Sequence, residues 1–134
     1  MIYLLDSSAW LAHLFGEPGA EEVTQLFENP KNQVIISALS LPEVFARLRA
    51  IGRQSHWSSV WETYSQLFSK VIPADETIAH QAVQLRARSR ERLPTIDGLI
   101  AATALVLQAT LVHRDPHLKA ISNPHLRQLM LPNK

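Results

Sequence analysis

Four carboxylates stand at points in the chain where they could act together: Asp6, Glu43, Asp97 and Asp115. Each one follows a predicted strand or lies in the first turn of a predicted helix. All four can therefore gather beyond the carboxyl ends of a parallel sheet, where such sheets bind ligands. Carboxylates at close range repel one another, and a bound divalent cation removes that conflict. Hard oxygen ligands suit Mg²⁺ or Mn²⁺, which can ionise a water and brace an in-line displacement at phosphorus.

Each acid also has a simpler explanation. Asp6 and Asp115 could end strands in turns, as aspartate often does. Glu43 and Asp97 could complement the dipoles of their helices. Any one explanation suffices for one acid, but we favour a shared site because all four acids fall at the same end of the predicted sheet. Ser8 as a nucleophile would need a neighbouring base, and the sequence offers no recognisable triad context.

Alternating apolar and polar segments predict the elements that must position these acids. We expect strands at residues 2–5, 34–36, 71–72 and 110–113, with a last edge strand within 126–131. We expect helices over 9–15, from 18 onward, over 40–52, over 57–68, from 75 or 77 onward, and over 95–107. Because strands and helices alternate, the fold class is α/β, with a mainly parallel sheet and helices on both faces.

The helix over 95–107 anchors this interpretation. It is apolar on nearly every side and rich in alanine, so it should be buried and lie close against the sheet. Pro94 marks its start and Thr95 is the expected N-cap. Asp97 is the only charge in this run and falls in the first turn.

Composition narrows the class of protein. The 134 residues suit one compact domain over 1–134, with 46% hydrophobic and 19% charged residues and a net charge of +1. There is no cysteine, which excludes a disulfide framework and a thiolate metal site. The first residues lack the pattern of a signal peptide and no apolar run reaches membrane-spanning length, so we expect a cytoplasmic protein with no membrane contact.

The acids and their neighbours resemble the PIN-domain nucleases, and the size is similar to that of VapC-type toxins from toxin–antitoxin pairs. The resemblance is carried by Leu4-Leu5-Asp6-Ser7-Ser8-Ala9-Trp10, Pro42-Glu43, the run from Leu93 to Ala104, and His113-Arg114-Asp115-Pro116-His117-Leu118. It implies a five-stranded parallel sheet in a three-layer α/β/α arrangement and a Mg²⁺- or Mn²⁺-dependent endoribonuclease.

The same resemblance implies the site and its partners. The metal-site acids of the family fall on Asp6, Glu43, Asp97 and Asp115, and its supporting hydroxyl falls on Ser8. An RNA substrate, a cognate antitoxin and pairing into a homodimer are also implied. One position departs from the family: His113 stands where a threonine or serine usually precedes the last acid by two residues. An imidazole there could replace the hydroxyl's hydrogen bond or disturb the site.

Arginines and aromatic residues suggest where partners would bind. Arg86, Arg88 and Arg47 could hold RNA phosphates, although arginines near helix ends are more often simply solvated. The helices at 45–51 and 57–68 carry more aromatic residues than a small core requires, which indicates an interface. These residues are Phe45, Trp57, Trp61 and Tyr64.

Two functions remain open from the sequence. The first is a metal-dependent endoribonuclease that hydrolyses RNA phosphodiester bonds with metal-activated water and acts as the toxin of a type II toxin–antitoxin pair. The alternative is a catalytically weak or inactive PIN-fold module that binds RNA or protein, with His113 as the residue that disables it. A phospho-acceptor receiver domain fits less well, because it needs a lysine at the end of a late strand and no predicted strand ends in one.

Overall fold

The computed structural model describes residues 1–134 and is built around a five-stranded sheet in the order β3-β2-β1-β4-β5. The strands are β1 (Ile2–Leu5), β2 (Gln33–Ser37), β3 (Lys70–Ile72), β4 (Thr110–His113) and β5 (Gln128–Met130). Every neighbouring pair is parallel. The predicted parallel sheet is therefore confirmed, and the strand expected near the C-terminus forms one edge of it.

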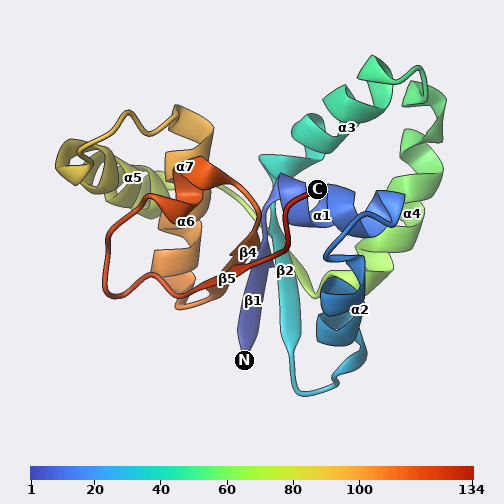
Figure 1. Cartoon of the computed structure of the whole chain (residues 1–134), viewed down its shortest axis with the longest axis horizontal. Coiled ribbons are helices and arrows are strands. Elements are labelled where there is room, and N and C mark those ends of the chain that lie inside the picture. The colour runs from blue at the N-terminus through green and yellow to red at the C-terminus, as the bar shows by residue number, and fades with distance from the viewer.

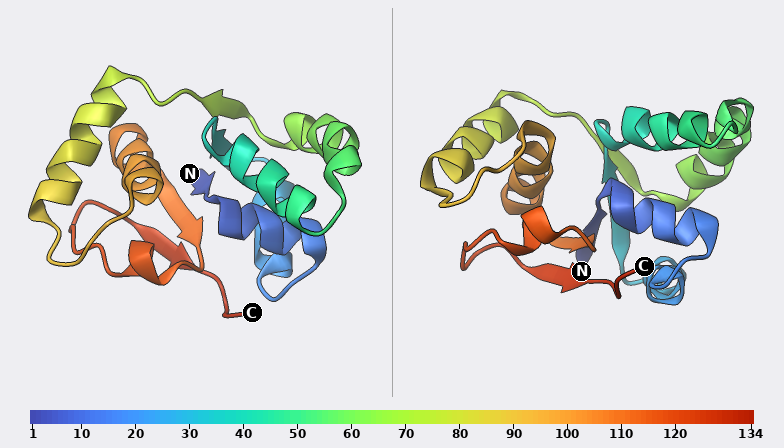
Figure 2. Two further views of the ribbon diagram at one scale, coloured as in Figure 1. Left: turned by 90° about the horizontal axis from the view of Figure 1, so that it is seen from above. Right: turned by 45° about the horizontal axis from the view of Figure 1, so that its top comes forward.

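Helices cover both faces of the sheet, as the sequence predicts (Figures 1 and 2). The helices are α1 (Ser7–Phe15), α2 (Ala20–Glu28), α3 (Ser40–Ala50), α4 (Trp57–Leu67), α5 (Glu76–Arg88), α6 (Thr95–Leu107) and α7 (Pro116–Lys119), with a 3-10 turn, η1 (Gln54–His56), before α4. Figure 1 shows α5, α6 and α7 on one side of the strands and α1 to α4 on the other. None of these helices combines the length and the apolar character needed to cross a bilayer.

Two separate cores hold the three layers together, because alternate residues of a strand face opposite sides of the sheet. Leu4 and Leu111 point toward α5 and α6, where they meet Ile100 and a group of alanines. Leu5 and Val112 point toward α1, α3 and α4, where aromatic rings fill the core around Trp10. The three central strands β1, β2 and β4 thus contribute apolar side chains to both cores, which explains why they are mainly apolar.

β1 lies in the middle of the sheet, and the direction in which the chain adds strands reverses beside it. From β1 the chain adds β2 and β3 on one side, and then β4 and β5 on the other. Leu5 pairs with Val112, and the Asp6 N–H donates to the Val112 carbonyl over 3.1 Å. The ends of β1 and β4 are therefore adjacent at the switch point, where ligands of open α/β sheets bind.

Helix starts differ in detail from the sequence prediction. Thr95 is the first residue of α6 and not its cap; Pro94 occupies the cap position in an extended conformation, and its carbonyl accepts the Gly98 N–H over 2.9 Å. Ser40 is likewise inside α3, and its buried hydroxyl has no hydrogen-bond partner. Of the two residues proposed to cap α5, Asp75 does so by accepting the Ile78 N–H over 3.0 Å.

Candidate active site

Asp6 is a buried carboxylate placed by the end of β1 and the start of α1. Its Oδ1 caps α1 by accepting the Ala9 N–H over 2.9 Å, and it also accepts the Ser8 hydroxyl over 2.7 Å. Burial raises the pKa of Asp6 to about 7; these two hydrogen bonds oppose the rise, and the charges of Asp115 and Asp97 add to it. Both hydrogen bonds engage the same oxygen, so Oδ2 is available for another partner.

Ser8 joins the ends of the two central strands. Its hydroxyl donates to Asp6 and accepts the Arg114 N–H over 3.1 Å. The Arg114 guanidinium forms an ion pair with Glu17, whose other oxygen lies 2.8 Å from Lys134 Nζ. Sequence reasoning named Ser8 but missed the Glu17–Arg114 pair, whose partners lie far apart in the chain and carry no local pattern. These contacts fix the backbone between β4 and α7 relative to Asp6.

His113 supplies a hydrogen bond of the kind that a hydroxyl at its position would make. Its side chain is fully buried, and Nδ1 accepts the Asp115 N–H over 3.0 Å. Because Nδ1 is an acceptor, the proton is on Nε2, which lies 2.7 Å from Gln128 Oε1 and donates to it. Burial lowers the pKa of His113, consistent with this neutral tautomer. The imidazole therefore orders the turn that carries Asp115 and does not disrupt it.

Asp115 follows β4 and caps the short helix α7. Its Oδ1 accepts the His117 N–H over 2.8 Å. The negative charge of Asp115 raises the pKa of Asp6, Glu43 and Asp97 alike. Asp115 thus interacts electrostatically with all three of the other acids, as Asp97 also does.

Glu43 and Asp97 approach from the two helix layers. Glu43 lies in the first turn of α3, and Asp97 lies in the first turn of α6. Burial is the main cause that raises the pKa of both, in the case of Asp97 to about 6. The charge of Glu43 also raises the pKa of Asp97, while His117 lowers it. An acid in the first turn can complement the helix dipole and also face the shared site. The two explanations given for these acids are therefore compatible.

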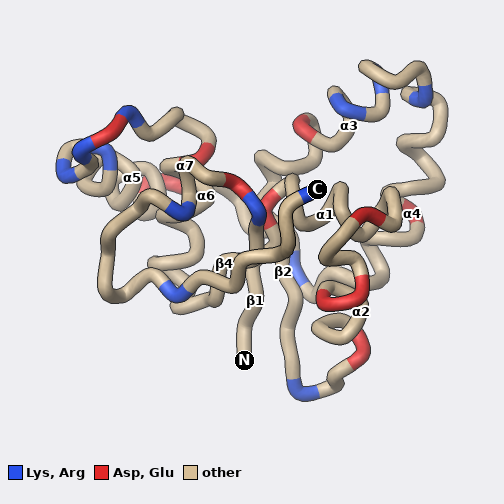
Figure 3. The backbone as a smooth tube through the Cα atoms, viewed as in Figure 1, with Lys and Arg blue, Asp and Glu red and all other residues tan.

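The four acids form one electrostatic cluster beyond the carboxyl ends of β1 and β4, which we call the acid cluster. Figure 3 shows acidic positions around these strand ends and near the starts of α3 and α7. No three histidine, aspartate or glutamate side chains converge closely enough to ligate one ion in this arrangement. The donor set nevertheless fits a hard divalent cation, because it consists of carboxylates, and burial raises the pKa of three of them, Asp6, Glu43 and Asp97.

The arginines proposed to contact RNA lie in three different settings. Arg47 is exposed on α3 and borders a hollow of about 190 Å³ together with Ser8 and Arg114. Arg88 borders a larger cavity of about 570 Å³ at the end of α5. Arg86 donates from Nε to the Leu93 carbonyl over 3.0 Å. That contact holds the loop before α6, so Arg86 has a structural partner as well as an exposed side chain.

The aromatic residues of α4 surround a residue that the sequence analysis did not single out as central. Trp10 is fully buried, and its ring centroid lies 5.2–6.2 Å from those of Trp57, Trp61, Tyr64 and Phe68. Trp57 and Trp61 are only half-buried and stack on each other. Tyr64, by contrast, is buried and lies 2.6 Å from His13 Nδ1, so it belongs to the core and not to an exposed interface.

Solved structures with the same fold include several toxin proteins. VapBC2 from Rickettsia felis, solved bound to a DNA fragment from the promoter, is similar over 97% of this chain and 98% of that chain, with 21% identity and a TM-score of 0.79. VapC20 from Mycobacterium tuberculosis, described as a Sarcin-Ricin loop cleaving toxin, is similar over 93% and 98%, with 15% identity and a TM-score of 0.71.

A third solved structure is VapBC-5 from Mycobacterium tuberculosis, described as a member of the VapBC family of toxin-antitoxin systems. It covers 96% of this chain and 96% of that chain, with 19% identity and a TM-score of 0.68. No curated protein matches the sequence. The family model described as the PIN domain matches residues 3–124. On the strength of that match, which spans all four acids, the chain belongs to the PIN domain family.

Proposed function

We propose that the chain is a divalent-metal-dependent endoribonuclease of the VapC type, acting as the toxin of a type II toxin–antitoxin pair. The observation that carries the proposal is the acid cluster: four carboxylates from four separate segments interact electrostatically at the switch point of the sheet. Membership of the PIN domain family supports a nuclease, and the description of VapC20 as a Sarcin-Ricin loop cleaving toxin supports RNA as the substrate.

The acid cluster would hold Mg²⁺ or Mn²⁺ through Asp6, Glu43, Asp97 and Asp115. Such a cation, when bound, activates a water and neutralises the charge that develops on a phosphate during in-line displacement. Because the pKa of Asp6 is about 7, its carboxyl group would have to release a proton before it could bind the cation. The oxygen that would contact the cation is Oδ2, since both hydrogen bonds of Asp6 engage Oδ1.

The neighbouring residues would act by holding these acids in place. Ser8 fixes the carboxylate of Asp6 and the backbone of Arg114 at the same time. His113 fixes the backbone of Asp115 through Nδ1. Both are positioning residues, since neither would touch the substrate. Arg47 and Arg88, which are exposed, would attract the phosphates of the RNA.

A cleavage assay on end-labelled RNA tests this proposal. The wild-type chain should cut RNA with Mn²⁺ or Mg²⁺ and stop when EDTA is added. Asp6→Asn keeps an acceptor oxygen for Ala9 and Ser8 but lacks the charge, and should reduce cleavage by at least about a hundredfold. Asp75→Asn is the matched control, because it makes the same change at the cap of α5 and should leave the rate unaltered. Equal rates for Asp6→Asn and the wild type would contradict the proposal.

A PIN-fold module that binds RNA or protein without cutting it is the second candidate. It is favoured by the absence of any three converging ligands in the acid cluster. The same assay distinguishes the two, with fluorescence anisotropy of labelled RNA measured in parallel. RNA binding without cleavage under either metal would support the second candidate.

An antitoxin and a second copy of the chain are the proposed partners. The description of VapBC-5 as part of a toxin-antitoxin family supports the first. Its docking surface would be the half-buried rings of Phe45, Trp57 and Trp61, which suit an amphipathic segment. Light scattering of the purified chain tests the homodimer, and a monomer at high concentration would contradict it.

A further inference from the structure

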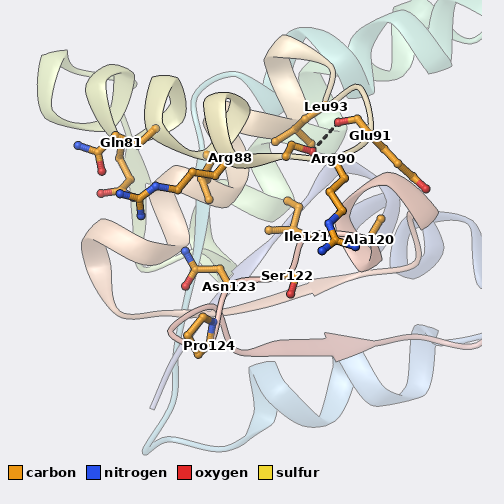
Figure 4. Close-up of a pocket in the computed structure, with 13 residues that line it drawn as sticks. Gln81, Arg88, Arg90, Glu91, Leu93, Ala120, Ile121, Ser122, Asn123 and Pro124 are labelled. Carbon is orange, nitrogen blue, oxygen red and sulfur yellow. Dashed lines mark hydrogen bonds between the residues drawn. The ribbon is translucent and has the colours of Figure 1, made fainter.

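A cavity of about 570 Å³ lies outside the acid cluster, since none of the four acids lines it. Figure 4 shows its walls: the end of α5, the loop leading into α6, and the loop that follows α7. Leu85, Leu93 and Ile121 form an apolar patch in a lining whose other residues are mostly polar. Its volume falls in the range of small-ligand sites, which combine an apolar lining with a few polar groups.

Asn123 offers the cavity a donor whose direction is already fixed. Its Oδ1 accepts the His125 N–H over 2.9 Å in a local turn. The side-chain amide therefore cannot rotate freely, and its Nδ2 group remains available to donate. Figure 4 shows the Asn123 side chain in the wall of the cavity. A donor held in this way loses little conformational entropy when a ligand binds.

Two arginines border the same cavity and have no acidic partner. Arg88 and Arg90 line it, and all ion pairs of the structure involve other residues: His80 with Glu76, and Glu17 with Arg114 and Lys134. Glu91 also lines the cavity, but Figure 4 shows its carboxylate directed away from Asn123. The cavity thus combines an apolar patch, a fixed amide donor and two guanidinium groups without an acidic partner.

The short helix α7 connects this cavity to the acid cluster. Asp115 caps the beginning of α7, and Ala120, just past its end, lines the cavity. The four residues of α7 rise about 6 Å along the helix axis, a distance that one or two nucleotides of an extended strand can cover. A single strand whose phosphate lay at the acid cluster could therefore place a neighbouring nucleotide in the cavity.

We propose that this cavity binds an unstacked base of the RNA, one or two nucleotides from the cleaved bond, and contributes to the choice of cleavage site. Proteins read single-stranded RNA by taking splayed bases into apolar pockets, hydrogen-bonding their edges and stacking arginine on them. The Asn123 amide would donate to an acceptor on the base, and Arg88 and Arg90 would hold the flanking phosphates. This inference rests on the proposed function, since it specifies how the RNA of that reaction is recognised.

Nuclear magnetic resonance titration tests the cavity without requiring cleavage. The four nucleoside 5′-monophosphates are added separately to ¹⁵N-labelled protein, with inorganic phosphate as the charge-only probe. At least one nucleotide should shift the amide signals of residues 88–93 and 120–124, whereas phosphate should leave 120–124 unchanged. Absence of a shift for all four nucleotides, or identical shifts with phosphate, would overturn the proposal.

Asn123→Asp tests the amide by removing its donor and adding a negative charge to the cavity. Aspartate keeps the oxygen that accepts the His125 N–H but replaces the donating amide with a second oxygen, so nucleotide affinity should fall about tenfold. Asn29→Asp is the matched control, because Asn29 Oδ1 accepts the Lys31 N–H in a similar exposed turn away from the cavity. Arg88→Gln should weaken binding several-fold, while Lys31→Gln, which removes an exposed charge elsewhere, should not. Equal affinities for Asn123→Asp and the wild type would also overturn the proposal.

Sequencing the ends of RNA fragments separates this inference from the proposed function. Asn123→Asp should change the preferred nucleotide next to the cut in a random RNA pool, while cleavage continues. An unchanged pattern from an active enzyme would reject the base pocket and leave the nuclease standing. Nucleotide binding in the cavity by a chain that cuts no RNA with either metal would reject the nuclease and support the pocket.

Discussion

The two helix layers of this protein are built in opposite ways. The core beneath α5 and α6 contains no aromatic residue and is formed by aliphatic side chains and alanines. The core beneath α1, α3 and α4 is centred on Trp10 and surrounded by other rings. Small side chains bring a helix backbone close to its neighbours, whereas large rings fill a wider space and leave edges exposed. The layer of α5 and α6 is therefore suited to hold a helix in a precise position. The layer of α1, α3 and α4 is suited to present a surface to a partner.

Each layer contributes two of the four acids. Asp6 and Glu43 come from the aromatic side, because they cap or begin α1 and α3. Asp97 and Asp115 come from the alanine side, because they begin α6 and cap α7. The acid cluster exists only when both layers are seated on the sheet. The difference between the layers can be tested by disturbing each in turn.

The largest effect is expected in the aromatic layer. Trp10→Ala removes a fully buried side chain that contacts four other rings, and should lower the free energy of unfolding by about 3–5 kcal/mol. Trp61→Ala, at a half-buried ring of the same cluster, should cost no more than about 2 kcal/mol. Urea denaturation followed by circular dichroism measures both, and equal losses would contradict a core centred on Trp10.

The next effect concerns Asp6 in the acid cluster, to which both layers contribute. Because of this acid, the metal-free protein should lose stability as pH rises. Burial raises the pKa of Asp6 to about 7 from the ordinary 3.8. Between these two pH values the native chain holds a proton on Asp6 that the unfolded chain has released. The contribution of this proton to the free energy of unfolding is fully present below about pH 4. It is lost as pH rises to about 7, and the total loss is about 4 kcal/mol. Urea midpoints measured in EDTA from pH 4 to 8 test this.

Asp6→Asn should remove the part of that pH dependence that Asp6 contributes, because the amide does not titrate, and leave the smaller part due to Asp97 and Glu43. Mn²⁺ should restore the stability of the wild type above pH 7 by binding the folded state only, and should have a weaker effect on the variant. If the stability of the wild type falls with pH no more steeply than that of Asp6→Asn, burial does not raise the pKa of this acid.

In the alanine layer, adding volume at a buried position of α6 should do more harm than adding it at an exposed one. Ala101 is fully buried on α6, so Ala101→Leu should cost about 1–3 kcal/mol by forcing the helix away from its neighbours. Val106→Leu, at a position on the same helix that is 37% exposed, should change stability by less than about 0.5 kcal/mol. Thermal unfolding compares the two, and a neutral Ala101→Leu would mean that the alanines are not closely packed.

The smallest effect is expected at His113. Threonine can still accept the Asp115 N–H, but it leaves Gln128 without its donor and leaves a small void, so His113→Thr should cost about 1–2 kcal/mol. Because Asp115 stays ordered, RNA cleavage should persist. His113→Ala removes the acceptor as well and should reduce cleavage. Loss of cleavage in His113→Thr would instead assign the imidazole a direct role.

Local patterns were sufficient to predict most of the elements. The apolar runs ending at Asp6 and His113, and the buried helix that carries Asp97, were all placed correctly because a strand or helix buried in the core must be apolar throughout. The caps were less predictable. Thr95 and Ser40 have the right chemistry for N-caps, but both lie one residue inside their helices, because Pro94 and Leu39 occupy the cap positions.

The sequence by itself determined which acids could act together, since their places at strand ends and helix starts follow from the periodicity around them. Only the tertiary structure decided how they are held. The bond from Ser8 to the Arg114 backbone, the pair formed by Glu17 and Arg114, and the cavity beside Asn123 all join segments distant in sequence. Such contacts leave no local pattern, because they depend on which surfaces meet when the two layers close on the sheet.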